Sequence, residues 1–243
     1  VPSAVLFDDA RTIVGEEARL RGKSHPERLA ACIKRDIGAP FYSQTIGGQR
    51  LPPEVIQACI LNKLRQNVLS SAGEECSAVI AVPAYFNDAQ RRATAEAGVM
   101  AGFQVMDILN EPAAAALAYG EQTGYLFPED CLGRGHYLLV YDLGGGTFDV
   151  SIIELNAGIV DVMATTGNNF LGGDDFDERL ANLVADEFQK QHKIDLRSDH
   201  RAWARLLQAA EQAKIDLSAA PFTTLSLEYI AETGKGKALH IRR

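Results

Sequence analysis

Three consecutive glycines framed by carboxylates form the part of this sequence best suited to chemistry. The segment 142–149 reads Asp-Leu-Gly-Gly-Gly-Thr-Phe-Asp, and apolar runs at 136–141 and 150–155 flank it. Such runs around consecutive glycines predict a strand, a tight turn and a second strand. The groups that could act there are Gly144, Gly145, Gly146, Thr147, Asp142 and Asp149.

A turn of this composition can serve as a phosphate cradle. Three glycines remove every Cβ, so the backbone N–H groups can approach a bound phosphate. Asp142 and Asp149, on the two strand ends, could hold a hydrated Mg²⁺, and Thr147 adds a hydroxyl. The alternative is an ordinary glycine-rich hairpin with solvated aspartates. Because a hairpin needs neither the aspartates nor the threonine, we favour the cradle with its own metal anchors.

A second glycine pair, Gly172 and Gly173, lies with Asp174 at the start of a helix predicted over about 173–192. Glycines at a helix start let a phosphate approach free N–H groups at the positive end of the helix dipole. An ordinary capping loop, with Asp174 or Asp175 as the N-cap, explains the residues equally well.

Glu211 and Lys214 are three residues apart on one face of a helix predicted over 199–217, and Ser218 follows closely. This pattern is compatible with a binding surface. It is also what a surface ion pair looks like, and such a pair contributes only a few tenths of a kcal/mol.

Four further residues carry weaker signals. Glu111 follows a predicted strand, where α/β proteins often place active-site carboxylates, although an acid that favours a helix start is equally possible. Lys34 by itself reads as a solvated lysine. Pro83 ends a buried strand, which a proline does for structural reasons alone, and Arg91 lies on the helix that follows.

The surrounding pattern predicts an α/β protein with a mixed sheet. A capping box at Ser24–Glu27 predicts a helix through Ile33 that ends at Gly38, and Gly47-Gly48 predicts a hairpin over 44–51. Other predicted helices begin at Pro52-Pro53, Asn87 and Pro112, in addition to 173–192 and 199–217. Predicted strands lie within 1–14 (two) and at 78–82, 105–109, 136–142, 147–155, 159–166, 223–230 and 237–241.

Composition indicates a soluble globular protein of 243 residues with 47% apolar content. The net charge of −8 argues against an electrostatic nucleic-acid or anionic-membrane surface. No apolar run has transmembrane length and no signal peptide is recognisable. The four cysteines (Cys32, Cys59, Cys76 and Cys131) are far apart, which favours free thiols in a reducing cytosol over disulfides or zinc.

The segment 142–149 resembles the second phosphate motif of the seventy-kilodalton heat-shock chaperones of the DnaK type. Other stretches agree with that family in the same order, over nearly the whole chain. They are Lys34-Arg35, Val82–Arg91, Asn110-Glu111-Pro112, Leu171–Asp177 and Glu211–Lys214. The short segment between Gly38 and Pro52, together with 167–171, is more similar to short bacterial paralogues than to the main housekeeping chaperone.

The resemblance implies an actin-like ATPase (ribonuclease H-like) fold, with two lobes that have mixed β-sheets and face a nucleotide cleft. Lobe I would be residues 1–123 and lobe II residues 136–243. The implied ligands are ATP or ADP with Mg²⁺, and the implied location is cytoplasmic. In a full-length parent, the implied partners are a peptide-binding domain, a J-domain co-chaperone and a nucleotide exchange factor.

The resemblance also implies roles for single residues. Lys34 would be the catalytic lysine, acting with Glu111, Asp142 and Thr147. Asp142 and Asp149 would anchor the metal, with Glu111 acting through water. The phosphates would face Gly144–Thr147 and Gly172–Asp174, while Glu211, Lys214 and Ser218 would hold the adenosine. Pro83 and Arg91 would relay the nucleotide state to the peptide-binding domain.

The family's first phosphate loop and the part that closes over adenine are missing, so the chain reads as truncated at both ends. Two functions are therefore expected. The first is an ATPase module of an ATP-dependent chaperone that assists protein folding. The second is a non-catalytic nucleotide-binding or interaction fragment that keeps the fold without the activity.

Overall fold

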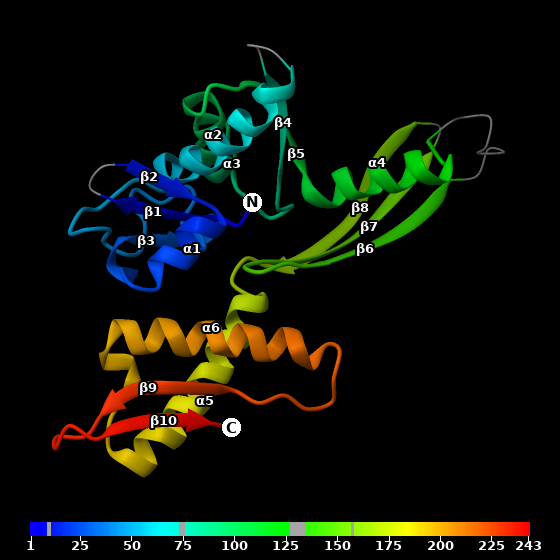
Figure 1. Cartoon of the computed structure of the whole chain (residues 1–243). Helices are drawn as coiled ribbons and strands as arrows, with labels where there is room; N and C mark the ends of the chain where they lie inside the picture. Colours follow the sequence, from blue (N-terminus) through cyan, green and yellow to red (C-terminus); the bar gives the residue numbers. More distant parts are fainter. Residues whose placement is uncertain (9–10, 73–75, 127–134, 157) are drawn as a thin grey trace.

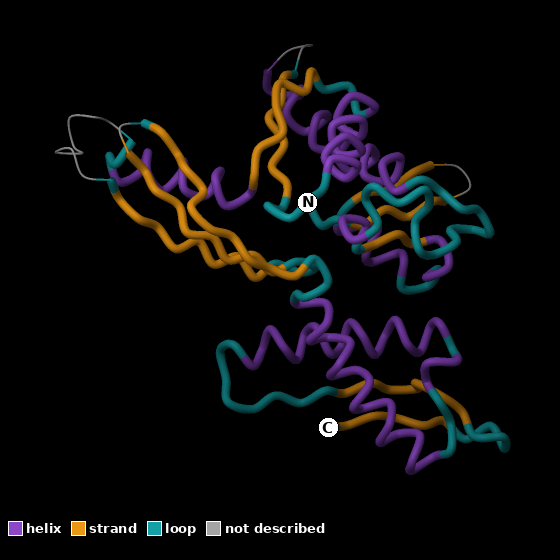
Figure 2. Tube along the Cα trace, turned by 180° about the vertical axis from the view of Figure 1, so that it is seen from behind, coloured by secondary structure: helices purple, strands orange, loops and turns teal. Residues whose placement is uncertain are grey.

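The computed structural model describes residues 1–8, 11–72, 76–126, 135–156 and 158–243. These residues form three units, each packed around its own buried apolar side chains (Figures 1 and 2). We call 1–110 the N-terminal unit, 111–168 the central unit and 169–243 the C-terminal unit. The ends of the central strands meet the start of the C-terminal unit below the N-terminal unit.

The N-terminal unit begins with a small antiparallel sheet. Strand β1 (Ala4–Asp8) pairs with β2 (Arg11–Val14) and β3 (Leu29–Ala31), and helix α1 (Glu16–Gly22) connects the last two. The two short strands predicted within 1–14 are confirmed. The helix predicted from the Ser24 capping box is wrong, because this stretch forms the 3₁₀ turn Pro26–Arg28 and then β3. Pairing with β1 buries Ala30 opposite Val5, and no local signal reveals that distant partner.

Two helices and two strands complete this unit, as predicted. The strand at 78–82 was expected to be buried, but its side chains alternate between exposed and half-buried up to the buried Val82. Helix α2 (Pro53–Ala72) begins at a proline, and Asn87 caps α3 (Asp88–Met100) through a capping box with Gln90. Strands β4 (Ser77–Val82) and β5 (Gln104–Asn110) are parallel. The predicted hairpin over 44–51 is reduced to one bridge, Ile46 to Gln49, across Gly47 and Gly48, which both have positive φ.

The central unit is an antiparallel sheet with one helix on it. Strands β6 (His136–Leu143), β7 (Phe148–Asn156) and β8 (Ile159–Asn168) confirm the three predicted strands. Helix α4 (Glu111–Thr123), predicted from Pro112, packs Ala116 on Ile153 and Leu155. Residues 127–134, which include Cys131 and lie between the two implied lobes, and residue 157, between the strands predicted at 147–155 and 159–166, lie outside the described residues. The division into two lobes stays a prediction.

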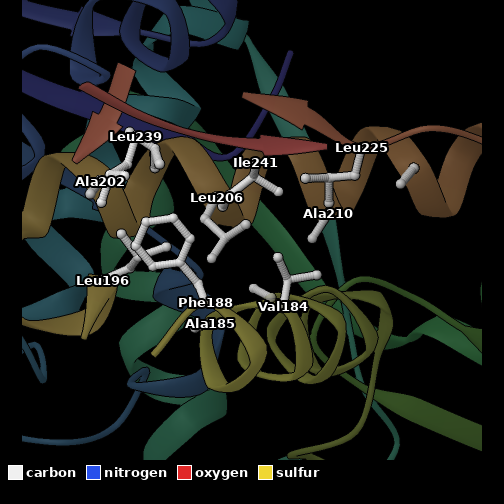
Figure 3. Packing of buried hydrophobic residues seen from close by; sticks show 13 residues of the cluster. Val184, Ala185, Phe188, Leu196, Ala202, Leu206, Ala210, Leu225, Leu239 and Ile241 are labelled. Atoms are coloured by element: carbon white, nitrogen blue, oxygen red, sulfur yellow. The ribbon is translucent and has the colours of Figure 1, made fainter. Parts of the chain in front are cut away.

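The C-terminal unit packs two helices on a hairpin. Helix α5 (Gly173–His192), the 3₁₀ turn Leu196–Ser198 and α6 (His200–Leu217) precede the antiparallel strands β9 (Ser226–Glu232) and β10 (Ala238–Arg242). Figure 3 shows their shared core, where Phe188, Leu206 and Ile241 point toward one another. Both helices and both strands were predicted.

The α/β class is confirmed, but its sheets are separate. Among the described strands, β4–β5 is the parallel pair and the remaining sheets are antiparallel, so the expected mixed pairing is divided among several small sheets. None of the helices in the described part of the chain is long and apolar enough to cross a membrane.

Candidate functional site

Asp142 on β6 and Asp149 on β7 lie next to each other on neighbouring strands of the central sheet. They are direct partners in the register of β6 and β7, next to the glycine turn. Side chains of directly opposite residues lie on the same face of a sheet, and like charges placed so repel. Asp149 is 2% exposed, and neither of its carboxylate oxygens has a hydrogen-bond partner among the described residues. Burial, and then Asp142, raises the pKa of Asp149.

Glu111 and Lys34 form a cluster of charged side chains with these two aspartates, and we call this cluster of four residues the acidic pocket. Lys34 Nζ, on the 3₁₀ turn Ile33–Arg35, lies 2.7 Å from Glu111 Oε1 at the start of α4. Burial raises the pKa of Glu111, which Lys34 lowers and the two aspartates raise further. One ammonium thus faces three carboxylates, and this imbalance favours a divalent cation.

Water-mediated binding of Mg²⁺ fits this pocket. Among the described residues, no three acidic, histidine or cysteine side chains are close enough to ligate one ion together. Mg²⁺ usually keeps several of its waters and takes few direct protein ligands. The two unpartnered oxygens of Asp149 provide acceptors for such waters, and Asp142 and Glu111 stand beside them.

The glycine turn leaves N–H groups free for an anion. Gly144 closes the turn by donating to the Thr147 carbonyl (3.0 Å), and Thr147 itself is buried. Within the described chain, the N–H groups of Gly145 and Gly146 donate no hydrogen bond. Consecutive free backbone donors beside a cation pocket are typical of phosphate sites.

The second glycine pair supports the first instead of presenting its own free donors. Gly173 N donates to Gly144 O (2.9 Å) and Asp174 N donates to Gly145 O (2.8 Å), so both N–H groups at the start of α5 are occupied. Gly172 permits this contact, since a Cβ there would lie 2.3 Å from Gly145 O. The N-cap of α5 is Gly172, so the alternative with Asp174 or Asp175 as the N-cap is wrong. Asp175 stands three residues later and accepts from Gly172 N (2.7 Å).

Of the three residues expected at the adenosine, Lys214 and Glu211 each form an ion pair with a different residue. Lys214 Nζ donates to Asp177 Oδ2 (2.7 Å) and to Gly173 O (3.0 Å), so it braces the second glycine pair. Glu211 pairs with Arg19 of the N-terminal unit. Ser218 is the exposed C-cap of α6. The alternative of a Glu211–Lys214 surface pair does not describe them.

Pro83 and Arg91 lie in one network. Pro83 is fully buried after β4, and the loop behind it is held by the Arg91 side chain. The Arg91 guanidinium donates to the carbonyl of Ala84 (3.3 Å), that of Phe86 (3.0 Å) and Asn110 Oδ1 (2.6 Å). Asn110 precedes Glu111, so the network ends beside the acidic pocket.

Arg35 is a site residue that sequence reasoning missed. Its Nη1 and Nη2 donate to the two oxygens of Asp175 (3.2 and 2.6 Å), and its Nε donates to Gly146 O (3.3 Å). Beside it, Cys32 Sγ donates to Asp174 Oδ2 (2.9 Å). Burial and then Asp174 raise the pKa of Cys32 to about 12. We call Cys32, Arg35, Gly146, Asp174 and Asp175 the arginine seam.

Comparisons with known proteins agree with the motifs. A model of the family described as "Hsp70 protein" matches residues 40–243. The proteins named "Chaperone protein DnaK" of Thermotoga petrophila and Thermotoga maritima are each 50% identical over 242 residues, which cover 99% of this chain and 39% of those proteins. That of Thermosipho africanus has the same identity and coverage.

The chain thus spans about two fifths of the length of these curated relatives. The family model covers well over half of the chain and contains both glycine motifs, with Asp142, Asp149 and Glu111. The chain therefore belongs to the Hsp70 family and is a homologue of its ATPase domain.

Proposed function

We propose that the chain binds Mg-ATP and Mg-ADP at the glycine turn and the acidic pocket, and that the pocket positions ATP for hydrolysis. One observation supports this above all. In the part of the chain that the structure describes, Asp149 is a buried carboxylate without a hydrogen-bond partner, opposite Asp142 and next to the turn with free N–H groups. Buried charge without a partner is costly, so a ligand that compensates it is expected.

Each part of the site has a role in this proposal. Gly144–Thr147 bind phosphate oxygens through the backbone, supported from behind by Gly172–Asp174. Asp142, Asp149 and Glu111 hold Mg²⁺ through its waters. Mg²⁺, when bound, supplies charge neutralisation at the phosphates. Lys34 orients Glu111 and adds positive charge near the γ-phosphate, where phosphoryl transfer depends on positioning and electrostatics.

The proposal also includes the details that the family resemblance implies. It includes the two-lobed actin-like arrangement and adenosine contacts from Glu211, Lys214 and Ser218. It also includes a relay through Pro83 and Arg91 to a peptide-binding domain in a longer parent. A J-domain co-chaperone and a nucleotide exchange factor would act on that parent.

Nucleotide binding without turnover is a second candidate, and the partners of Glu211 and Lys214 favour it. Both side chains already form ion pairs, with Arg19 and Asp177. An adenosine would have to replace these contacts or reach the side chains beside them. Weak fixation of the nucleotide lowers the rate, because hydrolysis depends on precise positioning.

Calorimetric titration of Mg-ADP and Mg-ATP into the 243-residue chain tests binding. A dissociation constant below about 10 μM, near −7 kcal/mol, supports the site. No detectable heat up to about 1 mM, roughly −4 kcal/mol, would refute nucleotide binding by this chain.

Asp142→Asn then separates hydrolysis from binding. We expect single-turnover hydrolysis of ATP to slow by at least about tenfold, roughly 1.4 kcal/mol in barrier. Asp161→Asn, at an exposed acid on β8, is the matched control and should leave the rate unchanged. Tight binding without turnover in the unmodified chain would favour the second candidate.

A further inference from the structure

All three carbonyl groups of the glycine turn are held from outside the turn. Two of the donors are backbone N–H groups at the start of α5, and the third is a side chain of the N-terminal unit. The bonds are Gly173 N to Gly144 O (2.9 Å), Asp174 N to Gly145 O (2.8 Å) and Arg35 Nε to Gly146 O (3.3 Å).

These bonds fix the direction of the N–H groups that could bind phosphate. A trans peptide is planar, with its C=O and N–H on opposite edges, and the described chain contains no cis peptide. Holding the carbonyls of residues 144, 145 and 146 therefore turns the N–H groups of residues 145, 146 and 147 away from those donors. Rotating one of these peptides would present a carbonyl, which repels a phosphate.

The third anchor differs from the other two in where it originates. Gly173 and Asp174 follow the turn closely along the chain, whereas Arg35 is 111 residues away in the N-terminal unit. Arg35 is in turn fixed by the two-oxygen contact with Asp175, and both side chains are less than one third exposed. One planar guanidinium uses three of its nitrogens here, which a lysine ammonium cannot reproduce.

We infer that Arg35 is a positioning residue that makes phosphate binding by the glycine turn depend on contact between the N-terminal unit and α5. With Asp175 in place, Arg35 holds the Gly146–Thr147 peptide with its N–H toward the phosphate. When the units separate, the carbonyl loses its donor and the peptide is free to rotate. This inference rests on the proposed nucleotide site and adds a means of regulating it.

A measurement without nucleotide tests the positioning itself. In Arg35→Gln, we expect the Thr147 amide resonance to shift and broaden in ¹⁵N–¹H spectra, because its peptide exchanges between two orientations. Arg197→Gln is the matched control. Arg197 also binds two carboxylates, Asp186 and Asp195, but has no contact with the turn. An unchanged Thr147 resonance in Arg35→Gln would overturn the inference.

A comparison of Mg-ADP with adenosine tests the consequence for binding. Arg35→Gln and Asp175→Asn should weaken Mg-ADP by about tenfold and leave adenosine unchanged, because only the phosphates contact the turn. Arg35→Lys should behave like Arg35→Gln, since it keeps the charge and loses the planar contact. Equal weakening of both ligands would mean that Arg35 only stabilises the fold, and would overturn the inference.

The two proposals fail in different ways. If the unmodified chain binds neither ligand, the proposed function is refuted, while the Thr147 resonance still decides whether Arg35 orients the peptide. If Mg-ADP binds equally well to the unmodified chain and to Arg35→Gln, the nucleotide site stands and the role of Arg35 is refuted.

Discussion

The acidic pocket and the arginine seam both adjoin the glycine turn. They differ in whether every carboxylate accepts a hydrogen bond. In the pocket, Lys34 faces three carboxylates, and none of the described residues donates a hydrogen bond to Asp149. In the seam, each carboxylate accepts from a named donor, Asp174 from Cys32 and Asp175 from Arg35. A buried carboxylate without a donor indicates a place for a ligand, and carboxylates that already accept hydrogen bonds indicate support for one.

Two aspartates express this difference as opposite pKa shifts. Burial raises the pKa of Asp149, whereas the hydrogen bond from Arg35 lowers that of Asp175. The side-chain type is the same, so the surroundings decide the sign. Variants in the two regions should therefore change stability in opposite directions.

Gly172→Ala should have the largest effect, because it forces apart the two loops on which both regions depend. The added Cβ would lie 2.3 Å from Gly145 O and 2.6 Å from Gly146 N, and both atoms belong to the backbone. We expect a loss of about 3 kcal/mol in the free energy of unfolding, measured with urea. Gly234→Ala is the control, since no atom of the described residues lies within 4 Å of its Cβ position. Equal stability of the two variants would contradict the loop contact.

Asp149→Asn should instead stabilise the unliganded chain. The folded state holds the proton of Asp149 more tightly than the unfolded state, so stability falls as pH rises from about 4 through the raised pKa. The neutral amide removes this fall and should gain about 1–2 kcal/mol at pH 8. Urea unfolding from pH 4 to 8, with and without Mg-ADP, measures it. The ligand should stabilise the unmodified chain more than the variant, and a variant less stable at pH 8 would oppose this account.

Much of the fold could be predicted because its signals are local. The Asn87 capping box and the strand–turn–strand pattern around the three glycines each lie within a few residues, and both are confirmed. The stretch after Ser24 failed because pairing with β1, more than twenty residues earlier, overrides its helical signal. Tertiary contacts of this kind leave no mark on the local sequence.

The site, like the fold, could be predicted only where its residues are close in the sequence. Asp142 and Asp149 could be placed together because a hairpin sets their register, whereas the meeting of Lys34 and Glu111 was implied only by resemblance. Arg35 escaped notice because its partners are 111 and 140 positions away. In the sequence, an arginine beside a lysine suggests only a solvent-exposed side chain on the protein surface. Only the folded chain shows that it reaches the glycine turn.

Asp175→Asn should give the smallest effect and the opposite pH dependence to Asp149→Asn. Arg35 lowers the pKa of Asp175, so the stabilisation is present above the ordinary value near 4 and is lost as pH falls through the lowered pKa. Because the pair is partly exposed, we expect the variant to lose about 1 kcal/mol at pH 7 and less below pH 4.

Urea unfolding at pH 7 and pH 3 measures this difference, with Glu187→Gln as the control. Glu187 pairs with Arg243, but both side chains are about half exposed, so its loss should cost less than Asp175→Asn. The asparagine can still accept from Gly172 N through its carbonyl oxygen, so the helix cap survives and the variant reports the ion pair. A loss that is equal at both pH values would mean that Asp175 acts as a cap alone. The seam would then lack the charge pairing that distinguishes it from the acidic pocket.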